Sequence, residues 1–240
     1  MSRNLQENYH HRAKTLVSYT QVQRTILREL PVEELANTVT HGFGLLLSVA
    51  GFAALLLLAI LQGGPMLIAA SVVYGISLIV LYTASTVYHA TTSPELKEKL
   101  RIVDHCCIYL LIAGSYTPFG IIIINGPFGL ALLALIWAFA IAGITAKLMF
   151  QHRFPILSVG SYVVMGWLGV FAVQPMLETL GSEAVMLAVA GGVSYTLGVI
   201  FFAWPRIRHH HAIFHVFVLA GSIFHYAAVV AYVVPYSASL

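Results

Sequence analysis

Two histidines near the end of the chain, His211 and His215, are spaced so that both can act on one chemical group. Four residues of an α-helix rise by about 6 Å and return to the same face, so both imidazoles can reach a common point. A third histidine, His89, lies in a separate apolar stretch. Three neutral nitrogen ligands with an open fourth position are typical of catalytic zinc, which lowers the pKa of its bound water to about 7. His209 and His210 adjoin His211, so the spacing alone leaves open which of these three histidines is the ligand.

A carboxylate and a hydroxyl accompany the histidines. Asp104 is the carboxylate that lies just inside an apolar stretch, at residues 103–124. The topology predicted below places it at the same end of the bundle as His89, His211 and His215. It could orient the water on a metal ion or accept its proton. Ser85 lies one helical turn before His89 and could hydrogen-bond that water, Asp104 or a substrate carbonyl. Ser85 and Asp104 are therefore the candidate catalytic residues beside a metal site.

Three more histidines lie in apolar stretches, where ionisable groups are costly and are functional candidates by default. His41 and His105 are expected beside the site or at the membrane interface. His225 follows His215 by ten residues, or about 15 Å of helix, which is too far to share the site. We expect it to make a buried hydrogen bond.

The elements that must position these residues are membrane spans. Hydrophobic residues make up 59% of the 240 positions and charged residues 9%, against about 45–50% and about 25% in soluble domains. This composition excludes most soluble enzymes, disulfide scaffolds and disordered chains. Apolar stretches of about 20 residues, long enough to cross a bilayer, predict an all-α integral membrane protein. This seven-transmembrane-helix bundle would occupy residues 33–240, with spans at 39–61, 66–89, 103–124, 128–147, 155–175, 184–204 and 211–234.

The basic residues predict the orientation of this bundle. All twelve Lys and Arg fall before the first span or in connections on the same side, whereas the other side carries Glu178 and Glu183. By the positive-inside rule, the N-terminus is cytoplasmic and the C-terminus outside. Residues 1–32 would form a cytoplasmic segment in which positions 14–30 favour an amphipathic helix on the membrane, ended by Pro31; a partly ordered basic tail is the alternative. Six of the candidate residues then gather in the cytoplasmic leaflet: His41, His89, Asp104, His105, His211 and His215.

The motifs around these residues resemble those of the hemolysin III family, the bacterial branch of the progestin and adipoQ receptor (PAQR) superfamily. They are Ala84–His89, Asp104–Pro118, His211–His215 with Gly221 and His225, and Asn37–Gly42 at the start of the first span. The resemblance extends from about Glu33 to Tyr232. It implies a seven-helix bundle unrelated to G-protein-coupled receptors, with no G protein as partner. It also implies Zn²⁺ held by His89, His211 and His215, with Asp104 beside the zinc-bound water and Ser85 matching the serine of related lipid amidases.

The resulting functional hypothesis is a bacterial inner-membrane protein of membrane homeostasis that hydrolyses a lipid amide or ester bond at the inner leaflet. A membrane lipid would be the substrate or ligand, and no nucleic acid is expected as a partner. One alternative keeps the zinc structural, in a sensor of membrane state without turnover. An ion or proton transporter is a weaker alternative. A pore-forming haemolysin is disfavoured, because no span carries a repeated polar face that would line an aqueous channel.

Overall fold

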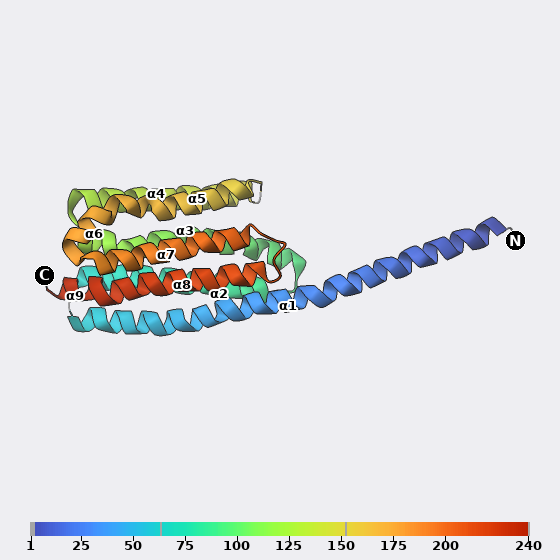
Figure 1. Cartoon of the computed structure of the whole chain (residues 1–240), viewed down its shortest axis with the longest axis horizontal. Helices are drawn as coiled ribbons and strands as arrows, with labels where there is room; N and C mark the ends of the chain where they lie inside the picture. The colour runs from blue at the N-terminus through green and yellow to red at the C-terminus, as the bar shows by residue number, and fades with distance from the viewer. Residues whose placement is uncertain (1–2, 63, 152, 240) are drawn as a thin grey trace.

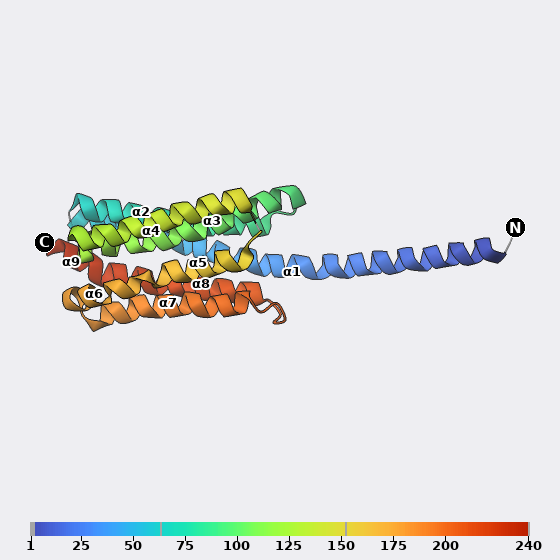
Figure 2. The ribbon, with the colours of Figure 1, turned by 90° about the horizontal axis from the view of Figure 1, so that it is seen from above.

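Seven helical spans lie side by side in one elongated bundle (Figures 1 and 2). The computed structural model describes residues 3–62, 64–151 and 153–239, with side chains described from residue 32 onward. Seven helices in this part of the chain are long and apolar enough to cross a membrane, which confirms the seven predicted spans. The elements are α1 (Arg3–Gln62), α2 (Pro65–Ala90), α3 (Pro94–Pro118), η1 (Phe119–Ile124), α4 (Gly126–Phe150), α5 (Pro155–Trp167), η2 (Leu168–Ala172), α6 (Val173–Leu180), α7 (Ser182–Phe202), α8 (His210–Ala228), η3 (Val229–Val233) and α9 (Val234–Ala238).

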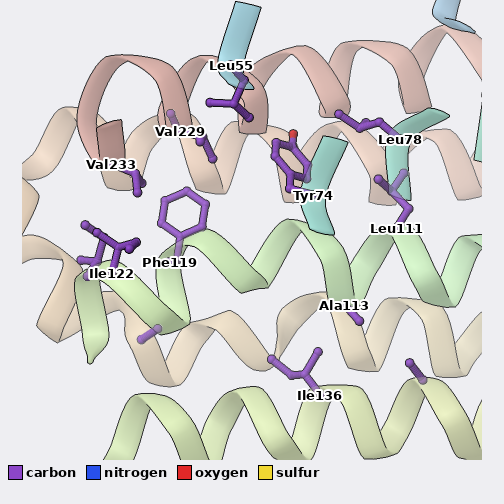
Figure 3. Packing of buried hydrophobic residues seen from close by; sticks show 14 of the residues in the cluster. Leu55, Tyr74, Leu78, Leu111, Ala113, Phe119, Ile122, Ile136, Val229 and Val233 are labelled. Carbon is purple, nitrogen blue, oxygen red and sulfur yellow. The ribbon is translucent and has the colours of Figure 1, made fainter. Parts of the chain in front are cut away.

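Three of the spans are interrupted helices. The third continues from α3 into the π-helical η1, and the fifth joins α5, the 3₁₀ segment η2 and α6. The seventh joins α8, the π-helical η3 and α9. Figure 3 shows Phe119 of η1 near Val229 and Val233 of η3, in a buried apolar region that also contains Leu55 and Tyr74. The two π-helical segments therefore meet in a part of the core away from His89, His211 and His215.

Proline sets the start of four spans. Pro65, Pro94, Pro127 and Pro155 each occupy one of the first two positions of a helix, where the missing N–H costs nothing and the fixed φ favours the helix. At Pro31 the outcome differs from the prediction, because α1 continues through this residue to Gln62. In Figure 1 the early part of α1 extends well beyond the bundle. The side chains of positions 14–30 lie outside the described residues, so their amphipathic face stays a prediction.

The third span also begins earlier than predicted. The predicted spans 66–89 and 103–124 leave a charged stretch between them as a connection. Most of this stretch belongs to α3, which starts at Pro94. Lys99 Nζ lies 2.9 Å from Glu95 Oε1 and Arg101 Nη2 lies 2.6 Å from Glu98 Oε1. Ion pairs three and four residues apart stabilise a helix. The charges therefore extend the helix beyond its apolar part instead of ending it.

Close packing joins α2 to α3 at a glycine. A methyl group at Gly114 would overlap the side chain of Ser77 on α2. Small residues at such a contact let helix backbones approach closely in a membrane, where packing drives association. This contact brings the start of α3, with Asp104, alongside the end of α2, with His89.

Candidate metal centre

Three histidine side chains converge from two helices at the end of the bundle from which α1 projects. His89 lies in the last turn of α2, and His211 and His215 lie in the first two turns of α8. One nitrogen of each ring lies within 4.8 Å of the corresponding nitrogens of the other two. The centroid of the His89 ring lies 5.0 Å from the centroid of the His211 ring and 5.0 Å from that of the His215 ring. The structure thus brings together the three histidines that the sequence proposed as ligands.

Helix α1 orients two of these rings through contacts that the sequence analysis missed. The Nδ1–H of His89 donates to Glu34 Oε2 at 2.7 Å. The Nδ1–H of His215 faces the carbonyl oxygen of Asn37 at 3.3 Å and Thr40 Oγ1 at 3.1 Å. A carboxylate or a backbone carbonyl on one nitrogen fixes the tautomer of a metal-binding histidine and leaves the other nitrogen for the metal. Both rings therefore present Nε2 toward the centre of the cluster.

The donor set fits a zinc ion. The Nε2 atom of His89 is buried and has no hydrogen-bond partner among the described residues. A buried polar atom without a partner is costly, and a metal ion would satisfy this one. Neutral imidazoles suit zinc, and three of them leave one position open.

His41 lies against the cluster without belonging to it. Its ring stacks on that of His215 with centroids 3.4 Å apart, and it meets the ring of Tyr82 edge-on at 5.0 Å. The side chain is buried, with 3% of its surface exposed. Stacking of this kind restricts the rotation of the His215 ring, so His41 supports the geometry of one ligand.

A cavity of about 340 Å³ adjoins the histidine cluster. His211 and His215 form part of its wall, and so do Ser85 and Asp104. Asp104 is buried, and Ser85 lies beside its carboxyl group. Away from these polar groups the wall is formed mainly by aliphatic and aromatic side chains of the second, third, fifth, sixth and seventh spans, and α1 contributes His41. An apolar cavity with a few convergent polar groups at one place is the usual form of a small-molecule site.

The remaining histidines have separate surroundings. His105 Nδ1 donates to the carbonyl oxygen of Arg101 at 2.6 Å and lies 3.6 Å from Asp104 Oδ2. His225 Nε2 donates to the carbonyl oxygen of Ala188 at 3.0 Å, in another part of the cavity wall. His225 thus makes the hydrogen bond expected of it, at a partly buried position, and stands apart from the cluster.

The neighbours of His211 also have places of their own. His210 Nδ1 donates to the carbonyl oxygen of Phe201 at 3.2 Å. His209 precedes α8 in a left-handed conformation with φ 56°. Of the three consecutive histidines, His211 is the one whose ring joins His89 and His215.

Comparison with known proteins places these residues in a defined family. The sequence profile described as "Haemolysin-III related" matches residues 31–226. The chain is 42% identical to "Hemolysin-3" of Bacillus cereus over 211 residues, which is 88% of this chain and 96% of the relative. It is 43% identical to "Hemolysin-3 homolog" of Bacillus subtilis (strain 168) over 190 residues, covering 79% and 89%. The human "Monocyte to macrophage differentiation factor" is 31% identical over 205 residues, covering 82% and 83%.

Proposed function

Because this chain belongs to the Haemolysin-III related family of membrane proteins, we propose that it is a zinc-dependent hydrolase acting on an amide or ester bond of a membrane lipid. The observation that carries the proposal is the cluster of His89, His211 and His215, two of which share the wall of one apolar cavity with Asp104 and Ser85. His89, His211 and His215 would hold the metal ion. A zinc ion in such a site acts as a Lewis acid toward an oxygen ligand.

The protein's own residues supply the other parts of the reaction. Asp104 accepts a proton from the attacking water, whose oxygen forms a bond to the carbonyl carbon of the lipid. The bond from that carbon to the amine or alcohol then breaks, and Asp104 returns the proton to the leaving group. Ser85 donates a hydrogen bond to the carbonyl oxygen, where negative charge develops. The apolar wall holds the acyl chain and excludes water from the reacting groups.

We further propose that the histidine cluster lies in the cytoplasmic leaflet of the bacterial plasma membrane. The twelve Lys and Arg, all predicted on one side of the spans, support a cytoplasmic N-terminus. Glu178 and Glu183 lie beside the connection between α6 and α7, which would face outward. A lipid of the inner leaflet would then place its headgroup linkage at the depth of the cluster, and its chain would follow the cavity.

The first test is the metal content of detergent-purified protein. We expect about one zinc per wild-type chain and its loss in His89→Ala, His211→Ala and His215→Ala. His210→Ala is the matched control, because this ring adjoins His211 but lies outside the cluster and should leave zinc in place. Wild-type protein that takes up no zinc even when the metal is supplied would overturn the proposal.

The second test separates hydrolysis from a structural role of the metal. Asp104→Asn should retain zinc but lose turnover of lipid amides and esters presented in mixed micelles. If Asp104→Asn keeps both zinc and the protein's function in the cell, while the variants of His89, His211 and His215 lose that function, the result would favour a sensor of membrane state. In that case the metal would join α2 to α8 without chemistry, since its ligands come from these two helices.

A further inference from the structure

We propose that Glu34 is a positioning residue for the metal centre, which acts by holding His89 so that Nε2 faces the ion. This inference rests on the metal site of the proposed function. It extends that site to α1, a helix none of whose described side chains belongs to the cluster. The observation behind it is the short contact of 2.7 Å between His89 Nδ1 and Glu34 Oε2.

The contact has the geometry of a charge-assisted hydrogen bond. The His89 side chain is 3% exposed, whereas that of Glu34 is 29% exposed, so the carboxylate reaches into the site from its edge. A carboxylate that accepts from the outer nitrogen fixes the ring orientation and makes the inner nitrogen a stronger ligand. No other hydrogen bond to the ring of His89 is made within the described side chains. Glu34 is therefore the group that determines how this ligand is presented.

Lys97 of α3 holds the Glu34 carboxylate in place. Lys97 Nζ lies 3.0 Å from the same Oε2 atom of Glu34. It also donates to the carbonyl oxygens of His89 at 3.4 Å and Thr91 at 3.3 Å, and lies 5.0 Å from the centre of the Tyr88 ring. Lys97 thus ties the carboxylate of α1 to the end of α2 that carries the ligand.

The neighbouring carboxylate supplies a matched control. Glu33 Oε1 accepts a hydrogen bond of 3.3 Å from the backbone N–H of His209. Among the described side chains it makes no hydrogen bond or ion pair with the three ligand rings. Glu33→Gln and Glu34→Gln remove the same charge one position apart on the same helix. Any difference between them in metal binding reports the contact with His89 and not the net charge at this end of α1.

The experiment measures zinc affinity of the full-length chain in detergent by competition with a chromophoric chelator. Losing a carboxylate partner of a ligand histidine typically weakens metal binding by about ten- to hundredfold. We expect a loss of this size in Glu34→Gln, a smaller loss in Glu34→Asp, and a change of less than about threefold in Glu33→Gln. The visible spectrum of protein loaded with Co²⁺ should change in Glu34→Gln but not in Glu33→Gln, because it reports the geometry of the ligands.

Each outcome decides between distinct conclusions. Equal affinities and spectra for Glu34→Gln and Glu33→Gln, with zinc bound by the wild type, would overturn the role of Glu34 and leave the metal site standing. A wild type without zinc would overturn the proposed function, on which the inference rests. If Glu34→Gln does not fold, the Glu34→Asp variant tests the same contact, and wild-type affinity with an unchanged Co²⁺ spectrum in that variant would refute the inference.

Discussion

Zinc should stabilise the folded bundle, because its three ligands come from helices that are far apart in the sequence. His89 lies in the last turn of α2 and His211 in the first turn of α8, so the unfolded chain does not assemble the site. A ligand that binds only the folded state at about 100 times its Kd contributes about 2.7 kcal/mol. For a chain of 240 residues, each kcal/mol shifts Tm by about 2–4 °C. The expected rise in Tm on adding zinc is therefore about 5–11 °C.

Two buried cysteines make this stabilisation measurable. Cys106 and Cys107 are free thiols, 8% and 3% exposed, and become reactive when the bundle opens. Heating the detergent-solubilised protein with a thiol-reactive fluorophore, with zinc or with a chelator, gives Tm in both states. His211→Ala should abolish the zinc-dependent shift and His210→Ala should preserve it. A wild-type protein that binds zinc but melts at the same temperature with the chelator would refute the reasoning that the metal joins α2 to α8.

Two further predictions concern contacts around the site. Gly191→Ala should destabilise the protein by about 1–3 kcal/mol, because the added methyl group would overlap the ring of His225. Gly160→Ala is the control, because a methyl group there has no neighbour within 4 Å and should change Tm little. Equal Tm values for the two variants would contradict the packing of Gly191 against His225. Thr40→Val should lower zinc affinity by less than about tenfold, because the Asn37 carbonyl still accepts from His215 Nδ1. A loss as large as that of His215→Ala would show that this carbonyl alone does not hold the His215 ring in place for zinc.

The sequence predicts the cluster of His89, His211 and His215 better than it predicts the groups that hold these rings. His211 and His215 can be paired from their four-residue spacing, and apolar surroundings mark His89 as unusual. Glu34 could not be paired with His89, because nothing in a linear sequence shows that the start of α1 lies against the end of α2. A signal was nonetheless present, since Glu34, Asn37 and His41 follow one another at helical spacing on one face of the first span.

The limits of the spans were predictable only where composition and helix geometry agree. Charged residues indicate the edge of the apolar core, and the third span was therefore predicted to begin at residue 103. The helix α3 begins at Pro94 because backbone hydrogen bonds and the pair between Lys99 and Glu95 continue it into the polar region. Hydropathy indicates which residues lie in the hydrocarbon core of the membrane, whereas the ends of a helix depend on its local hydrogen bonds and ion pairs. The π-helical η1 and η3 left no trace in the hydropathy for a similar reason, since they interrupt the backbone without changing the apolar character of the span.

The position of the ligands along the chain has a consequence for how the protein is made. Two of the three lie at the start of α8, which leaves the ribosome after six spans have already been synthesised. A nascent chain that stops before His210 carries His89 and Glu34 but lacks His211 and His215, two of the three proposed ligands. Under the proposed function, metal loading would therefore belong to the last stage of biogenesis, after the final span has inserted and folded back against α2. The bound ion would then distinguish completed molecules from truncated ones.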